Sequence, residues 1–215
     1  IASSDIDAWP LLESVAKLGK PVIISTGGAS ERTVDNTVSF FQKRNVPLAI
    51  NHCVSLYPSE DSELELNQID YLRHRYPDNI IGWSSHEQYD WEASMFISYA
   101  KGARTWERHI DIDSEEHGVT AYCTRPDQAD IWFKAFLKAE EMSGGSGSQK
   151  RVIPKREIEY LDALVRGLYA KRDLEQGYVF AHENFNRDFY LAVPLVKGQV
   201  SVREVLDGET LTEDI

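Results

Sequence analysis

The chain has 215 residues, of which 42% are hydrophobic and 27% charged. This composition is rich enough in apolar residues to bury a core and excludes a wholly disordered polypeptide. The 35 acidic residues outnumber the 23 basic ones, and the formal net charge is −12. Because such a surface repels phosphate backbones, we expect no nucleic-acid partner. No stretch approaches the roughly 18 uninterrupted apolar residues of a membrane span, so we also expect no membrane partner.

The cysteines and the first residues bear on the compartment of the protein. Cys53 and Cys123 fit neither a zinc spacing nor a disulfide framework. A reducing, cytoplasmic location is therefore the simplest prediction. The opening residues, 1–5, resemble neither a signal peptide nor a natural N-terminus.

Short β-branched runs alternate with helical patterns in the first part of the chain. The runs predict buried strands over residues 21–25, 47–52, 79–84 and 104–109. After Ser30, a predicted N-cap, one helix carries a single apolar face formed by Val34, Val38 and Phe41. A second helix ends before Pro77. Its apolar positions are Leu66, Ile69, Leu72 and Tyr76.

Two further helices are predicted over residues 91–102 and 126–142. Pro126 suits the first turn of the last helix, in which we expect Ile131, Phe136 and Ala139 to face the interior. Strands and helices that alternate with short connections indicate parallel pairing and an α/β fold.

The length per strand–helix unit suggests a particular α/β architecture. A TIM (β/α)8 barrel uses roughly 31 residues per unit, and residues 22–142 contain four units in 121 residues. We therefore interpret residues 1–142 as the later part of a TIM barrel whose N-terminal strands precede this chain, since half a barrel alone would leave unpaired edges. A self-standing open α/β sheet is the alternative.

The composition changes abruptly after the last predicted helix. Residues 143–156 are rich in Gly, Ser and basic residues and are predicted to form a flexible linker. Residues 157–215 are predicted to form a small β-rich domain. Two weakly similar stretches, 177–185 and 208–215, are predicted to form hairpin-like units within it.

Two histidines follow neighbouring predicted strands. His86 and His109 lie where strands 79–84 and 104–109 end, and the carboxyl ends of strands form the active-site face of a barrel. Because adjacent strands lie about 4.8 Å apart, the two imidazoles could share a metal ion. The alternative is a pair of hydrogen-bonded rim histidines. His52 is better interpreted as a packed side chain, and His117 has no evident partner.

Hydroxyl side chains recur at the same strand ends. Small polar residues between a strand and a helix expose backbone N–H groups and hydroxyls to an anion, although each alone is more often a turn or cap. Their repetition predicts a phosphate site that includes Ser3, Ser25, Ser55 and Ser84. Asp5 and Tyr57 share this predicted rim and could handle a proton or a hydroxylated ligand.

These motifs resemble those of the sialic acid synthase family, and in particular its spore-coat polysaccharide biosynthesis protein E branch. The resemblance covers nearly the whole chain in order. It rests on Gly19-Lys-Pro-Val-Ile-Ile-Ser-Thr-Gly, His52-Cys-Val-Ser-Leu-Tyr-Pro, Ile81-Gly-Trp-Ser-Ser-His, Glu107-Arg-His and Asn184-Phe-Asn-Arg-Asp-Phe-Tyr-Leu-Ala-Val-Pro.

The resemblance implies a fold, a reaction and an assembly. The fold is a TIM barrel followed by an antifreeze-like (SAF, β-clip) domain, here residues 157–215. The reaction condenses phosphoenolpyruvate with an amino-sugar aldehyde of the N-acetylhexosamine type, giving a nonulosonic acid and phosphate for surface polysaccharide. The assembly is a homodimer in which each C-terminal domain caps the partner's site.

The resemblance also implies residue roles. His86 and His109 correspond to ligands of a divalent metal, manganese or magnesium, and are catalytic. Ser3, Ser25 and Ser84 correspond to positions that bind phosphoenolpyruvate, with Ser55 in place of a typical asparagine. Asp5 stands for a catalytic glutamate, and Tyr57 for a sugar-contacting tyrosine.

Two positions depart from the family pattern. An acid usual after the last strand is replaced by Val119, with Glu115 or Glu116 as possible substitutes, and the arginine of the antifreeze-like domain is replaced by Val193 or Phe189. Two other functions therefore remain open. One is a sugar- or metal-binding protein derived from the enzyme, and the other is a different metal-dependent aldolase on the same barrel.

Overall fold

The computed structural model describes residues 1–114, 118–193, 195, 201 and 203. The chain divides into two compact units, Ile1–Gly145 and Ser146–Ile215. Within the described ranges, no helix is both long and apolar enough to cross a bilayer.

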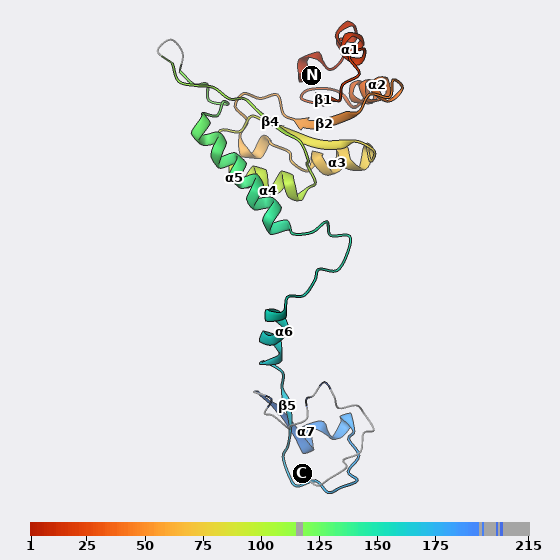
Figure 1. Ribbon diagram of the computed structural model, residues 1–215, viewed down its shortest axis with the longest axis vertical. Coiled ribbons are helices and arrows are strands. Elements are labelled where there is room, and N and C mark those ends of the chain that lie inside the picture. The colour runs from red at the N-terminus through yellow and green to blue at the C-terminus, as the bar shows by residue number, and fades with distance from the viewer. Residues whose placement is uncertain (115–117, 194, 196–200, 202, 204–215) are drawn as a thin grey trace. The chain divides into compact units, whose positions relative to one another are not determined.

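The first unit contains a parallel sheet of four strands, as the alternating pattern predicted (Figure 1). The strands are β1 (Val22–Ser25), β2 (Leu48–Cys53), β3 (Ile80–Ser85) and β4 (Trp106–Arg108), and they lie in chain order. Every neighbouring pair is parallel, which brings all four carboxyl ends to one edge of the sheet. The predicted strands are confirmed, and the α/β class with them.

Helices follow the strands at the predicted places. They are α1 (Trp9–Ala16), α2 (Glu31–Gln42), α3 (Gln68–Arg75), α4 (Trp91–Ala100) and α5 (Pro126–Ser143), with short 3-10 turns η1 (Ser3–Asp5) and η2 (Asp61–Glu63). The predicted cap is confirmed, since the Ser30 hydroxyl accepts a hydrogen bond of 3.1 Å from the Thr33 backbone N–H. Helix α1 was not predicted.

The main core lies between the sheet and its helices. Ile24, Ile50 and Ile81 on the strands are buried against the apolar side chains of α2 and α3, so the predicted face of α2 is confirmed. Of the second predicted face, Ile69 and Leu72 lie on α3, whereas Leu66 and Tyr76 are buried just outside its ends. The prediction for Ile131 in α5 is wrong, because this side chain is 42% exposed whereas the adjacent Trp132 is 8% exposed. The buried positions of α5 are Ala129, Trp132, Ala135 and Ala139.

The sheet is curled rather than flat. Strands β1 and β4 lie at opposite ends of the strand order, and three strand spacings in a flat sheet would separate them by roughly 14 Å. Nevertheless the Ser25 hydroxyl on β1 donates a hydrogen bond of 2.6 Å to Glu107 Oε1 on β4. The curl therefore turns these side chains toward a common space on the concave face.

The second unit pairs two short strands that are distant in sequence. It contains α6 (Lys155–Asp162), β5 (Gly167–Ala170), η3 (His182–Asn184), α7 (Phe185–Asp188) and β6 (Phe189–Ala192). Strands β5 and β6 are antiparallel. The stretch 177–185, for which a hairpin-like unit was predicted, holds the end of a turn, a β-bridge residue at Val179 and η3, and the predicted unit over 208–215 lies outside the described residues. Helix α6 begins inside the predicted linker.

A buried carboxylate organises this second unit. Asp188 accepts hydrogen bonds from Arg172, Arg187 and Tyr178, at 2.6 to 2.9 Å. These donors lower the pKa of the Asp188 carboxyl, the Arg187 bond contributing most. The charge is thus neutralised where β6 begins, beside an apolar cluster of Leu174, Phe180 and Phe189.

Candidate functional site

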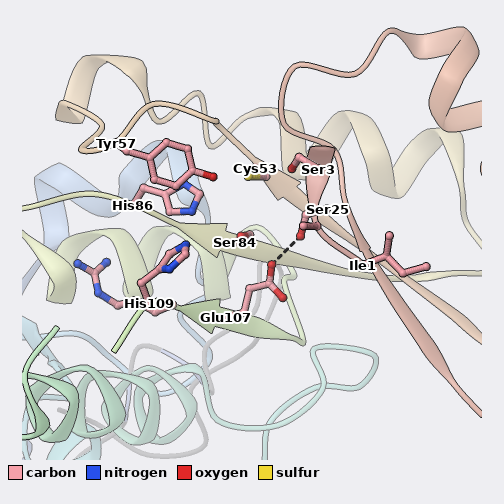
Figure 2. Close-up of a pocket in the computed structure, with 11 residues that line it drawn as sticks. Ile1, Ser3, Ser25, Cys53, Tyr57, Ser84, His86, Glu107 and His109 are labelled. Atoms are coloured by element: carbon pink, nitrogen blue, oxygen red, sulfur yellow. Dashed lines mark hydrogen bonds between the residues drawn. The ribbon is translucent and has the colours of Figure 1, made fainter. Parts of the chain in front are cut away.

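A cavity of about 360 Å³ opens at the carboxyl ends of the four strands. Figure 2 shows its side chains converging from all four strands. The lining consists of Ile1, Ala2, Ser3, Ser25, Cys53, Tyr57, Ser84, His86, Glu107, Arg108 and His109. Six of the residues predicted from the sequence are therefore brought together: Ser3, Ser25, Tyr57, Ser84, His86 and His109.

The two histidine rings lie side by side, as Figure 2 shows. Their centroids are 5.2 Å apart and their planes are inclined by 42°. His86 directly follows β3 and is buried, and His109 directly follows β4 and is exposed. Parallel pairing in register produces this proximity, since Ser85 pairs with Arg108 in the sheet.

Both rings are held in a state suited to metal binding. Burial lowers the pKa of His86, and partial desolvation of the ring together with the neighbouring His86 lowers the pKa of His109. His86 Nδ1 lies 2.9 Å from the Val54 carbonyl oxygen, so Nδ1–H donates there and the lone pair is on Nε2. Neutral imidazoles with a free nitrogen are good metal ligands.

The donor set restricts which metal fits. Among the described residues, no group of three or more His, Cys, Asp or Glu side chains is placed to hold an ion. The histidine pair thus offers two imidazole nitrogens, and the resemblance assigns Val119 to the position of the usual acid. Imidazole suits transition metals, whereas Mg²⁺ prefers oxygen ligands.

Hydroxyl groups gather around Gly27, just after β1. The Gly27 backbone N–H donates a hydrogen bond of 2.9 Å to Ser3 Oγ. A Cβ atom at Gly27 would lie 2.0 Å from Ser55 Oγ, 2.9 Å from Ser3 Oγ and 3.0 Å from Cys53 Sγ. Only glycine leaves room for these groups to approach one another. Ser55 is therefore adjacent to the rim although it is not part of the cavity lining.

Glu107 is a site residue that the sequence reasoning did not single out. Its carboxylate accepts the Ser25 hydrogen bond at 2.6 Å and lines the cavity. Strand alternation was the available signal, because Glu107 and His109 are two residues apart and residues so spaced share a face. The same spacing relates Ser84 to His86.

Aromatic rings cover the histidine pair. The Tyr57 ring is half exposed. Its centroid lies 4.1 Å from the centroid of the His86 ring and 5.9 Å from that of the His109 ring. Tyr122, which sequence reasoning did not identify, lies 5.1 Å from Tyr57 and 5.3 Å from His109. A ligand at the imidazoles would thus meet an aromatic wall.

The remaining predicted residues lie elsewhere. Asp5 belongs to η1 and is not part of the cavity lining. His52 is buried and its Nε2 lies 2.8 Å from the Leu64 carbonyl, which confirms its interpretation as a packed side chain. Glu115, Glu116 and His117 lie outside the described residues.

A model of the NeuB family matches residues 1–146 of the chain. The chain belongs to the NeuB family. Several relatives of this NeuB-family chain are named as synthases of sugar acids.

Individual relatives extend the match into the second unit. The spore coat polysaccharide biosynthesis protein SpsE of Bacillus subtilis is 29% identical over 196 residues, covering 86% of this chain and 52% of SpsE. The N-acetylneuraminate-9-phosphate synthase of Drosophila melanogaster is 36% identical over 128 residues, covering 58% and 33% of the two chains.

A solved structure shows the same fold. It is assigned as a spore coat polysaccharide biosynthesis protein E from Chromobacterium violaceum, with a TM-score of 0.79 and 30% identity, and the match covers 100% of this NeuB-family chain and 66% of that one. The chain spans a third to about half the length of the curated relatives it matches.

Proposed function

We propose that the protein is a phosphoenolpyruvate-dependent synthase. It condenses phosphoenolpyruvate with an N-acetylhexosamine-type aldehyde, yielding a nonulosonic, sialic-acid-like acid and phosphate for surface polysaccharide. The observation that carries this proposal is the pair of neutral imidazoles, 5.2 Å apart, in a cavity rimmed by serine hydroxyls. Membership of the NeuB family and the names of its relatives support the substrate class.

His86 and His109 would hold the divalent metal, manganese or magnesium. When bound, the ion supplies Lewis-acid polarisation of the sugar aldehyde. The hydroxyls of Ser3 and Ser84 donate to the phosphate group and orient carbon 3 of phosphoenolpyruvate toward the aldehyde carbon. Ser25, the third predicted phosphoenolpyruvate position, instead donates its hydroxyl proton to Glu107. Tyr57 packs against the sugar and excludes water from that side of the cavity.

Proton transfer is assigned to Glu107 rather than to Asp5. Glu107 lines the cavity, and its Oε1 is oriented by Ser25, whereas Asp5 is not part of the lining. The Glu107 carboxylate takes a proton from the water that adds at carbon 2. The new bond between carbon 3 and the aldehyde carbon leaves the aldehyde oxygen as an alkoxide, and this oxygen receives the proton from Glu107. Cleavage of the bond between carbon 2 and the phosphate oxygen then leaves a keto group and releases inorganic phosphate.

The proposed assembly follows the family. The first unit would form the later part of a TIM barrel, the second an antifreeze-like SAF domain, and the enzyme would be a cytoplasmic homodimer whose C-terminal domains cap the partner's sites. The curled sheet, with its strand ends at one cavity, supports the barrel.

The experiment uses the protein expressed from its complete reading frame. Phosphate release is measured with phosphoenolpyruvate, Mn²⁺ and a panel of N-acetylhexosamines. We expect release with at least one sugar and its loss in His86→Ala and His109→Ala. His74→Ala, at an exposed helical histidine, is the control. Absence of release from the native enzyme with every hexosamine contradicts the proposal.

The valine at position 119 favours a second candidate, a catalytically altered relative that binds sugar or metal without turnover. In that case Mn²⁺ binding would depend on His86 and His109 while phosphate release stayed absent. A different metal-dependent aldolase would instead turn over aldehydes without consuming phosphoenolpyruvate.

A further inference from the structure

A buried ion pair lies at the ends of the strands that carry the two histidines. Arg108 Nη1 is 3.0 Å from Glu87 Oε2, and the two side chains are 2% and 0% exposed. Glu87 directly follows His86, and Arg108 directly precedes His109. Each member of the ion pair is therefore the sequence neighbour of one of the two histidines.

The arginine ties several segments together. Its Nη1 donates to Ser85 Oγ at 3.1 Å, its Nη2 donates to the Glu87 carbonyl at 2.5 Å, and its Nε donates to Thr124 Oγ1. On the other side, Glu87 Oε1 accepts a hydrogen bond of 2.8 Å from Ser94 in α4. Strand β3, strand β4, helix α4 and the segment before α5 are thus joined at one point.

The same point fixes the backbone beside His109. The Thr124 backbone N–H donates to the His109 carbonyl at 2.9 Å, so the residue that binds the Arg108 side chain also holds the histidine. A guanidinium presents its donors in a rigid fork, and such a fork restricts the relative positions of the groups it joins. Together, these contacts fix the distance between the carboxyl ends of β3 and β4.

The energetics argue against stability as the only role. Removing two charges from water costs about as much as their attraction returns, and replacing a buried pair by apolar residues is often neutral or stabilising. A core made only for stability could therefore use apolar side chains here. What the pair adds is a defined geometry.

We propose that Glu87 and Arg108 are positioning residues that set the separation of the His86 and His109 rings. By locking the ends of β3 and β4 together, they hold the two imidazole nitrogens ready for one ligand. The use of that geometry for a metal rests on the proposed function, but the geometry itself does not.

The test compares the native protein with the double variant Glu87→Leu/Arg108→Met. Three quantities are measured: the urea unfolding midpoint, the nuclear Overhauser effect between the His86 and His109 ring protons without metal, and the affinity for Mn²⁺ by calorimetry. We expect a folded variant with a midpoint close to the native one, a lost ring–ring effect, and Mn²⁺ binding weakened about tenfold or more.

The control is the double variant Asp35→Leu/Arg75→Met, which replaces an ion pair outside the cavity by apolar side chains. This pair joins α2 to α3 with bonds of 2.6 and 3.0 Å, and its exchange should leave the ring–ring effect and Mn²⁺ affinity unchanged. Should Glu87→Leu/Arg108→Met fail to fold, Arg108→Lys replaces it. That variant keeps the charge but loses the fork, and we expect a weakened ring–ring effect.

The outcomes separate the two proposals. A folded variant with native ring–ring effect overturns the positioning role. If the ring–ring effect is present in the native protein and lost in the variant, the positioning role is supported. If the native protein in that case does not bind Mn²⁺, the proposed metal chemistry is contradicted. A native protein without the effect overturns both.

Discussion

Ser25 and Glu107 are 82 positions apart in sequence and lie on the two outermost strands of the sheet, yet their side chains share a hydrogen bond of 2.6 Å. Figure 2 draws this bond as a dashed line between two of the side chains that line the cavity. The bond occupies one oxygen of the Glu107 carboxylate and thereby orients the other within the cavity.

Ser25→Ala tests this orientation. Without the hydroxyl, Glu107 is free to rotate, and we expect kcat/KM of the phosphate-release reaction to fall about tenfold or more, which corresponds to about 1.4 kcal/mol. The unfolding midpoint should change little, because the bond is only part-buried. Ser14→Ala, at a hydroxyl on α1, is the control. Unchanged kcat/KM would remove Glu107 orientation from the mechanism.

Gly27→Ala tests the crowding of hydroxyls after β1. The new methyl group would meet Ser55 Oγ at 2.0 Å, so Ser3 and Ser55 must move. We expect a KM for phosphoenolpyruvate raised by at least tenfold. Gly28→Ala is the matched control, because its Cβ meets nothing within 4 Å and its φ of +71° adds only backbone strain, about 1 kcal/mol. Equal KM values in the two variants would contradict the steric argument.

The acid dependence of Mn²⁺ binding follows from the histidine pKa values. Burial of His86, and partial desolvation of His109 beside it, lower the pKa of both rings, so each ring stays neutral below the ordinary value of about 6.5. Because protons compete with the metal for these nitrogens, binding should persist through pH 6.5 and weaken only as pH falls through the lowered pKa values. Calorimetry across a pH series measures this. A binding midpoint above the ordinary histidine value would contradict the prediction.

Adjacent residues of α5 should differ sharply in their effect on stability. Trp132 is 8% exposed and packs with Met95 and Ala135, whereas Ile131 is 42% exposed. We expect Trp132→Ala to reduce the free energy of unfolding by about 3–5 kcal/mol and Ile131→Ala by about 0.5 kcal/mol or less. Urea denaturation gives both values. Similar losses would mean that the helix is rotated from its described orientation.

The sequence by itself determined the local elements of the first unit. The strands, the cap at Ser30 and the stop at Pro77 depend on backbone preferences and periodicity, which are properties of neighbouring residues. His86 and His109 were also predictable as a pair, because parallel strands in chain order bring successive strand ends together.

Only the tertiary structure decided the contacts that depend on curvature, register and rotation. Sheet curl brought Ser25 to Glu107, and helix rotation buried Trp132 in place of Ile131. In the second unit, β5 pairs with β6 across 18 intervening residues, so no local hairpin pattern could reveal it. Such contacts join residues that are distant along the chain, and local periodicity carries no information about which distant partner a side chain meets.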